Sequence, residues 1–226
     1  MLIVKEVYNM RYSANEKNLS FYYGAMGCGK TSKLIGDYYA VKDANFSAIV
    51  IKPGKDTKGS SGVISRAGGY IETAFLIGSN DNIFVMVEDY LVNVNEHLDF
   101  VLVDEVQFLE EHHIDEIVSL VDELGINVFC YGLMTDFQGN LFEGSRRLIE
   151  VGAELERLSI PCKCGAERTH NMRLENGKPV FEGEQVAIDG VEAVYEAVCR
   201  KCYNGAKRRV RSKLDSHQMI ISGFEE

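Results

Sequence analysis

The chain has 226 residues, of which 46% are hydrophobic and 26% charged. These values are typical of a globular protein with one large domain, or with one domain and a small second unit. It contains 24 Lys and Arg against 34 Asp and Glu, a formal net charge of −10. This acidic balance argues against a nucleic-acid binder, which normally presents a basic face to phosphates. We therefore expect no nucleic-acid partner and interpret the basic run at 207–213 as a solvated tail.

The sequence gives no sign of a membrane segment or a secretory leader. No apolar stretch approaches the roughly 20 residues that span a bilayer, and the N-terminus lacks a cleavage-type signal pattern. We therefore expect a cytoplasmic protein with no membrane partner. In that compartment the six cysteines are expected to be thiols or metal ligands and not disulfides.

Short apolar runs alternate with amphipathic stretches through the first two thirds of the chain. We expect strands over 19–23, 48–51, 83–87, 100–103 and 126–133. We expect helices over 32–45, 114–124 and 148–158, and a long Gly-, Ser- and Lys-rich loop over 53–69. Strands that are apolar throughout, separated by amphipathic helices, imply a parallel sheet covered on both faces. The predicted fold class is therefore α/β.

The segment Gly24–Thr31 reads GAMGCGKT and matches the phosphate-loop pattern G-x-x-x-x-G-K-[ST] at every fixed position. The loop follows a predicted strand and opens a predicted helix, which is the context that the pattern requires. Lys30 would reach the β- and γ-phosphates, and the Thr31 hydroxyl would ligate Mg²⁺. The predicted triphosphate-binding residues are Gly24, Ala25, Met26, Gly27, Cys28, Gly29, Lys30 and Thr31.

An acidic pair, Asp104 and Glu105, ends the apolar run 100–103. An acid at the carboxyl end of a strand beside a phosphate loop suits Mg²⁺ binding, which we assign to Asp104. Glu105 would face the second substrate and accept a proton from an attacking hydroxyl or water. The pair alone leaves two functions open, an ATPase that positions water and a kinase that positions an alcohol.

Four of the six cysteines form two close pairs, Cys162 with Cys164 and Cys199 with Cys202. Paired cysteines in an intracellular chain are typical of a tetrahedral Zn²⁺ site with four thiolates. With all four positions filled by protein, such an ion would be structural. Long elements give way to short polar segments at about Ser159, where we place a domain boundary. The predicted organisation is an extension over 1–18, a nucleotide-binding domain over 19–158, a zinc-binding domain over 159–205 and a tail over 206–226.

These features together resemble the zinc-containing, type II thymidine kinases, and the C-x-C first pair resembles the bacterial branch. The matching segments span residues 21–203 in the family's order: FYYGAMGCGKTSKLI, VLVDEVQFL, CYGLMTDFQGNLFEGS, LSIPCKCGAERTHNMRL and EGEQVAIDG…YEAVCRKCY. The resemblance implies a RecA-like phosphate-loop sheet and a small C-terminal domain with a zinc site and a substrate-covering "lasso". It also implies transfer of the γ-phosphate of ATP to the 5′-hydroxyl of thymidine or deoxyuridine, giving the monophosphate in nucleotide salvage.

The resemblance also assigns residues within this sequence. It implies that Glu105 is the general base and that Asp104, Val106 and Gln107 belong to the same nucleotide-site motif. It implies a thymidine site formed by Met26, Phe108, Leu133, Phe137, Phe142, Val186, Ile188, Asp189, Gly190 and Tyr195. Arg66, in the long loop, is a candidate phosphate contact. The family resemblance further implies a homotetramer inhibited by the end product dTTP. The alternative that we retain is a phosphate-loop ATPase in which Glu105 activates water.

Overall fold

The computed structural model describes residues 18–54, 62–65, 68–94, 97–185 and 193–222. These residues divide into two compact units. The first, which we call the sheet unit, comprises residues up to 24 together with 29–134 and 141–158. The second, the cysteine unit, comprises 25–28, 135–140 and the residues from 159 onward. The four x positions of the phosphate-loop pattern thus belong to the cysteine unit, although the strand before them and the helix after them belong to the sheet unit.

The sheet unit is built on six strands in the order β5-β2-β6-β7-β1-β8. Every pairing between neighbouring strands is parallel. The central strands are buried along their whole length, as their continuous apolar runs predict. The strands are β1 (Leu19–Tyr23), β2 (Ala48–Pro53), β5 (Phe75–Ile77), β6 (Phe100–Val103), β7 (Asn127–Gly132) and β8 (Glu154–Arg157). The predicted α/β parallel sheet is confirmed.

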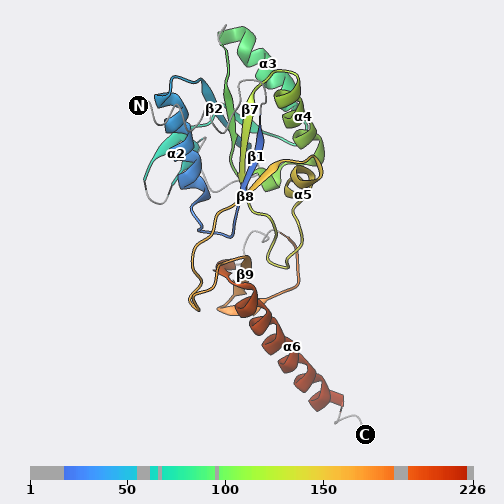
Figure 1. The fold of residues 1–226 in the computed structure, drawn as a ribbon. Coiled ribbons are helices and arrows are strands. Elements are labelled where there is room, and N and C mark those ends of the chain that lie inside the picture. Colours follow the sequence, from blue (N-terminus) through green and yellow to red (C-terminus); the bar gives the residue numbers. More distant parts are fainter. Residues whose placement is uncertain (1–17, 55–61, 66–67, 95–96, 186–192, 223–226) are drawn as a thin grey trace. The chain divides into compact units, whose positions relative to one another are not determined.

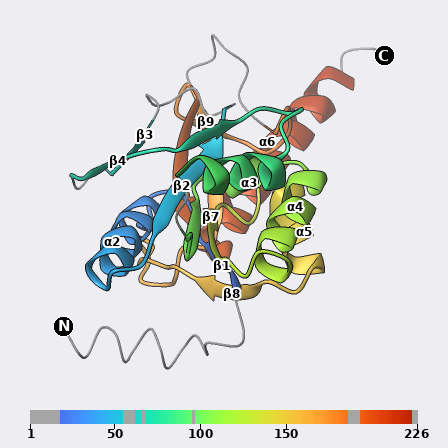
Figure 2. The ribbon, with the colours of Figure 1, turned by 90° about the horizontal axis from the view of Figure 1, so that it is seen from above.

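Helices cover both faces of this sheet (Figures 1 and 2). On one face α2 (Lys30–Asp43) packs through Leu34 into one hydrophobic cluster. On the other face lie α3 (Ile83–Val94), α4 (Glu111–Asp122) and α5 (Glu143–Glu150), which share a second cluster. A 3₁₀ turn, η1 (Val106–Phe108), follows β6. The two clusters hold the strands rigidly, so the residues that follow their carboxyl ends have fixed positions.

The strand predicted over 83–87 is wrong, since these residues begin the helix α3. An apolar run of five residues cannot by itself distinguish a strand from a buried helix. The helix is set by Asn82, whose side-chain Oδ1 accepts a hydrogen bond from the Val85 amide at 2.8 Å. The sheet edge is formed instead by β5, a three-residue strand that the sequence pattern did not reveal.

The helix predicted over 148–158 is also wrong in its extent. The helix α5 starts earlier and ends at Glu150, because Gly152 adopts a φ of 81° and the Gly152 amide closes the last turn on the Ile149 carbonyl. The chain then forms β8, whose sequence ELER has a single apolar residue and so lacks the pattern of a buried strand. Part of the predicted 53–69 loop is ordered as well, since β3 (Gly62–Ile64) pairs with β4 (Tyr70–Glu72).

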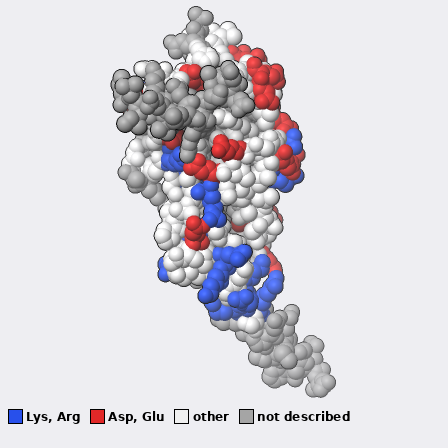
Figure 3. Space-filling view, viewed as in Figure 1, with Lys and Arg blue, Asp and Glu red and all other residues white. Residues whose placement is uncertain are grey.

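The cysteine unit contains an antiparallel sheet in the order β10-β9-β11. Its elements are β9 (His170–Glu175), β10 (Lys178–Val180), β11 (Ala193–Val198) and the helix α6 (Arg200–Ser222). A small buried cluster joins Met172, Phe181, Val198 and Tyr203 with two of the cysteines. The basic run expected in a tail begins inside α6, and Lys and Arg gather over the first part of this helix (Figure 3). No helix in the described ranges is both long and apolar enough to cross a bilayer.

Candidate active site and metal centre

The phosphate loop joins β1 to α2, and two of its glycines adopt the left-handed backbone conformation. Gly27 has a φ of 74° and Gly29 a φ of 87°, values that a residue with a Cβ rarely adopts. Gly29 is also the N-cap of α2, where its carbonyl accepts the Lys33 amide at 2.9 Å. A glycine-rich turn that leads into a helix N-terminus directs backbone N–H groups toward an anion. The local conformation is therefore the one that the sequence pattern predicts.

Lys30, the invariant lysine of the phosphate-loop pattern, is the first residue of α2 and is 8% exposed. Its ammonium donates to the Gly24 carbonyl at 3.2 Å. The Lys30 side chain therefore folds back toward the start of the phosphate loop, where Gly24 lies.

Glu105 follows β6 and has a φ of 49° and a ψ of 40°. A non-glycine residue in this region costs about 1–3 kcal/mol, and such residues gather at functional sites. The preceding residue, Asp104, is 7% exposed, and its amide donates to the Ile51 carbonyl at 3.0 Å. The two adjacent carboxylates thus have different environments, since Asp104 is buried at the carboxyl end of β6 and Glu105 is only partly buried.

Gln107 links Glu105 to the next strand. Its Nε2 donates to Glu105 Oε2 at 2.6 Å, and its Oε1 accepts the Leu133 amide at 2.9 Å. The Gln107 side chain is 2% exposed, so both of its amide groups are used inside the protein. Gly132 makes room for it, because a Cβ built there would lie 2.5 Å from Gln107 Oε1. The carboxylate of Glu105 is therefore held in one orientation by a buried amide that is itself held by β7.

Three of the residues predicted to bind thymidine lie close together in the sheet unit. The rings of Phe108 and Phe142 meet edge to face, with centroids 5.8 Å apart. The Leu133 carbonyl accepts a hydrogen bond from the Ser145 hydroxyl at 2.6 Å, and the Leu133 amide is the one bound by Gln107. Ser145 is fully buried, so it fixes the Leu133 backbone from the opposite side. The aromatic pair, Leu133 and the Glu105 carboxylate thus belong to one bonded assembly.

Three further predicted thymidine residues, Met26, Phe137 and Tyr195, lie in the cysteine unit. The Met26 amide donates to Oδ1 of Asn171 at 2.8 Å. Phe137 is 1% exposed, and its carbonyl accepts the Tyr203 hydroxyl at 2.6 Å. Tyr195 lies on β11, opposite Arg173 of β9. Four other predicted residues, Val186, Ile188, Asp189 and Gly190, lie outside the described residues, as does Arg66.

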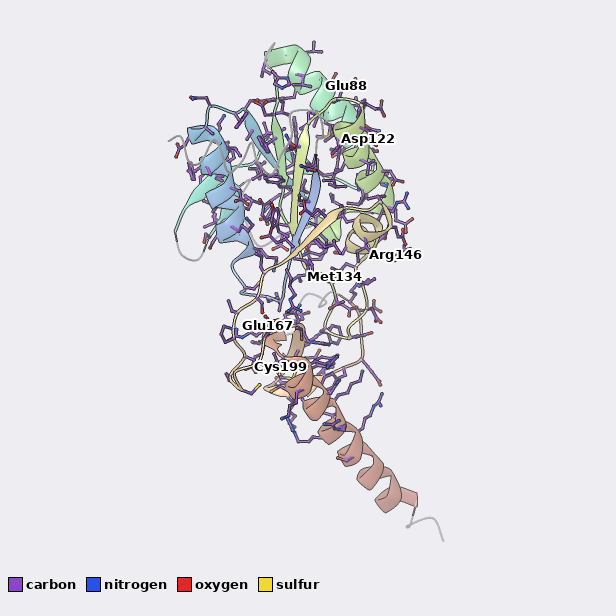
Figure 4. The ribbon with its side chains drawn as sticks, viewed as in Figure 1. Glu88, Asp122, Met134, Arg146, Glu167 and Cys199 are labelled. Carbon is purple, nitrogen blue, oxygen red and sulfur yellow. The ribbon has the colours of Figure 1, made fainter. Side chains whose placement is uncertain are left out.

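The four cysteines predicted as metal ligands come together in the cysteine unit. All four Sγ atoms of Cys162, Cys164, Cys199 and Cys202 lie within 4.8 Å of one another. A tetrahedral ion with Zn–S bonds of about 2.3 Å needs its sulfur atoms ~3.8 Å apart, so the set fits such an ion. Cys199 immediately precedes the first turn of α6 (Figure 4). The fit is to a closed, structural site, because protein thiols supply every ligand.

Two of these thiols have a lowered pKa, which favours the thiolate form that binds a metal. The backbone amide of Cys164 lowers the pKa of Cys162, with a further contribution from the amide of Cys199. The amide of Cys202 and the thiol of Cys164 lower the pKa of Cys199. By contrast, burial raises the pKa of Cys130, a thiol in β7 outside the cluster. Within the cluster the thiolate form is therefore favoured at Cys162 and Cys199, whereas the thiols of Cys199 and Cys164 raise the pKa of Cys202 to about 12.

Sequence reasoning missed several residues that position the site. Ser145 and Asn171 escaped notice because single polar residues in a helix or strand carry no motif. Lys52 is buried, with 3% exposure, and lies beside the carboxyl end of β6 on the neighbouring β2. Its position at the end of an otherwise apolar run could have indicated that this lysine is buried. Arg173, 5% exposed on β9, gave no comparable signal.

Comparison with known proteins identifies the family. The family model described as thymidine kinase matches residues 17–203. A thymidine kinase of Legionella pneumophila is 36% identical over 200 residues, covering 87% of this chain and 95% of that protein. Thymidine kinases of Shewanella oneidensis and Lactobacillus acidophilus are 39% and 37% identical, covering 81% and 82% of this chain and 94% and 95% of theirs. The expected resemblance is confirmed, and the chain belongs to the thymidine kinase family.

Proposed function

We propose that this chain transfers the γ-phosphate of ATP to the 5′-hydroxyl of thymidine, or of deoxyuridine, in nucleotide salvage. The observation that carries the proposal is the Glu105 carboxylate, which a left-handed backbone and the Gln107 amide hold at the carboxyl end of β6. A base fixed in this way suits an acceptor that must be deprotonated in one orientation. Family membership supports a nucleoside as that acceptor.

In this proposal the phosphate loop, Gly24–Thr31, binds the ATP phosphates. Backbone amides of the loop contact phosphate oxygens, and Lys30 neutralises charge on the β- and γ-phosphates. The Thr31 hydroxyl and Asp104 are the residues that would hold Mg²⁺, whose charge lowers the electrostatic cost of transfer. Val106 and Gln107 complete the nucleotide-site motif. Gln107 acts on the reaction through Glu105.

Glu105 is the general base of the proposed reaction. It accepts the 5′-hydroxyl proton as the nucleoside oxygen attacks the γ-phosphorus and ADP leaves. The hydrogen bond from Gln107 Nε2 occupies one carboxylate oxygen, Oε2. The other oxygen is then the one directed to the hydroxyl, so Gln107 fixes which oxygen takes the proton. The competing reading, an ATPase in which Glu105 activates water, uses the same geometry and differs only in its acceptor.

Thymidine recognition is assigned residue by residue. In the sheet unit we assign it to Phe108, Leu133 and Phe142, and in the cysteine unit to Met26, Phe137 and Tyr195. Aromatic and apolar side chains suit the faces of a pyrimidine base. We assign the remaining contacts to Val186, Ile188, Asp189 and Gly190, in the segment that resembles the family's lasso.

Three further properties complete the proposal. Zn²⁺ occupies the four-cysteine cluster and supplies structural stability there. The enzyme is a cytoplasmic homotetramer, and dTTP, as the end product, inhibits it. A single-chain mass by light scattering would refute the tetramer, and unchanged rates in the presence of dTTP would refute the feedback.

The test of the function is ATP consumption with and without thymidine, with the nucleotide products identified. Thymidine-dependent formation of ADP and thymidine monophosphate is the expected result, and turnover indifferent to thymidine would establish the ATPase instead. Replacing Glu105→Gln should lower kcat by roughly a hundred-fold to ten-thousand-fold and leave ATP affinity nearly unchanged. The matched control is Glu88→Gln on α3, an exposed glutamate labelled in Figure 4, which should keep full activity.

A further inference from the structure

Two polar side chains are buried on β9 in the cysteine unit. Asn171 is 4% and Arg173 is 5% exposed. They are two residues apart on one strand, so they project from the same face of it. Buried polar groups must find hydrogen-bond partners inside the protein. Their partners indicate what this face of β9 holds in place.

Asn171 holds the phosphate loop. Its Oδ1 accepts the amide hydrogen of Met26 at 2.8 Å, across 145 positions of sequence. The phosphate-loop pattern restricts no side chain at Met26, and it does not predict that the Met26 N–H donates to a side chain of another segment. Because this N–H donates to a side chain, the contact fixes the backbone at the residue whose side chain we assign to thymidine.

Arg173 holds two other segments. Its guanidinium lies 5.1 Å from the centroid of the Phe137 ring, and its Nη1 donates to the Glu184 carbonyl at 3.2 Å. Its charge is balanced by Glu175, whose Oε1 lies 2.7 Å from Nη2. The buried Nε–H finds no hydrogen-bond acceptor among the described residues. A buried arginine with one donor unused is costly, which is unexpected for a residue that serves packing alone.

The two segments that Arg173 contacts are also bonded to each other. Gln138 Nε2 donates to the Gly183 carbonyl at 2.5 Å, and Gln185 Nε2 donates to Asp136 Oδ2 at 3.2 Å. These two bonds join residues 135–140 to residues 183–185, and the Tyr203 hydroxyl ties Phe137 to α6. The guanidinium lies between them, and loss of its planar fork would release both from β9.

We propose that Asn171 and Arg173 are positioning residues for the nucleoside, acting through Met26 and Phe137. Asn171 sets the backbone of Met26, and Arg173 sets the Phe137 ring and the 183–185 segment. The inference rests on the proposed function, since that proposal assigns Met26 and Phe137 to thymidine. It goes further in naming two residues that need not touch the substrate and that determine its affinity from the zinc-bearing unit.

The test uses Arg173→Met and Arg173→Lys in the full chain. We expect Arg173→Met to raise the KM for thymidine at least ten-fold, with the KM for ATP within two-fold of the parent and the bound zinc unchanged. Arg173→Lys, which keeps the charge and loses the fork, should give an intermediate KM. The matched control is Lys178→Met, an exposed basic residue on β10 of the same sheet, and it should change neither KM.

Asn171→Leu separates the two contacts. Leucine has nearly the same volume and cannot accept the Met26 N–H. Because Met26 lies inside the phosphate loop, this variant should raise the KM for both ATP and thymidine, unlike Arg173→Met.

The inference is overturned if the Arg173 variants melt at a lower temperature with both KM values unchanged, which is the signature of a purely structural residue. If Arg173→Met fails to fold, Arg173→Lys decides by its thymidine KM alone. Failure of the proposed function gives a different result, because the parent enzyme itself would then show no thymidine-dependent turnover. That result would refute the inference as well.

Discussion

The two units of this chain obtain their stability from different sources. The sheet unit has a large buried cluster on each face of a six-stranded sheet, formed from aliphatic and aromatic side chains. The cysteine unit has one small cluster, and two of its buried members are the proposed metal ligands Cys162 and Cys199. Burial of apolar area can stabilise the first unit without help. The second unit lacks that area, and we propose that it depends on a metal ion bound by its four thiolates.

The units also hold their functional residues by different means. In the sheet unit a left-handed backbone at Glu105 acts together with the Gln107 side chain, for which Gly132 makes room. In the cysteine unit side chains hold these residues, through Asn171 and Arg173. A residue in a left-handed backbone conformation tolerates few substitutions. A supporting side chain, by contrast, can be replaced without changing any residue that contacts the substrate. The comparison predicts that perturbing one unit will leave the other largely intact.

The largest expected effect comes from removing the metal. Thiolate binding of a structural zinc contributes on the order of 10 kcal/mol in small domains, which is more than the cysteine unit can replace by burial. With a strong chelator, the amides of β9 and β11 should lose hydrogen-exchange protection while those of β6 and β7 keep theirs. Simultaneous loss of protection in both units would contradict the comparison.

A matched variant sharpens this experiment. Cys130→Ala removes a buried thiol that lies outside the cluster, in β7. It should leave the bound zinc unchanged and lower the stability of the sheet unit. Cys202→Ser should do the reverse, by lowering the zinc content and sparing the protection of β7.

A smaller effect is expected from opening a cavity in the sheet unit. Ile117 on α4 is fully buried in the cluster that this helix shares with the sheet. Ile117→Ala should lower the free energy of unfolding by about 2–5 kcal/mol, measured by urea denaturation, and leave the zinc content unchanged. Val92→Ala on α3 is the control, because Val92 is 79% exposed; its effect should lie within about 0.5 kcal/mol. Equal losses in the two variants would be evidence against the packing described.

The smallest effect on stability, and the most specific, is expected at Gly132. A Cβ there would displace the Gln107 amide and Val106. Gly132→Ala should therefore cost about 1–3 kcal/mol of stability and, by releasing Glu105, lower kcat more than ten-fold. The control is Gly36→Ala on α2, where, apart from its sequence neighbours and the backbone of its own helix, no described atom lies within 4 Å of the added Cβ. That variant should keep its activity, and unchanged kcat in Gly132→Ala would refute the role given to Gln107.

Features with a strong local signal were predictable from the sequence. The phosphate loop is contiguous, the strands at 19–23 and 100–103 are wholly apolar, and the cysteines pair by spacing. These local patterns were sufficient to predict a parallel sheet and a cluster of four cysteines, both of which the structure contains. The acidic pair Asp104–Glu105 does follow the strand at 100–103, as the sequence indicated, and its role in catalysis stays a prediction.

Features that depend on distant partners were not predictable. The run 83–87 became a helix because Asn82 caps it, and the short β5 took the edge of the sheet. Asn171 bonds to a residue 145 positions away, a distance at which no spacing rule operates. Arg173 reads as an ordinary charged residue of a strand until its burial is known. Roles of this kind arise from tertiary packing and leave no periodicity in the sequence.

The backbone of Glu105 has a consequence for any effort to evolve or engineer this protein. Glycine adopts the left-handed conformation at no cost, while the glutamate there costs about 1–3 kcal/mol. Glu105→Gly would remove this backbone cost, but it would also leave the buried Gln107 Nε2–H without its acceptor, at a cost of about 1–3 kcal/mol. The hydrogen bond that orients the base therefore also offsets the strain of its backbone, so the same contact serves stability and catalysis.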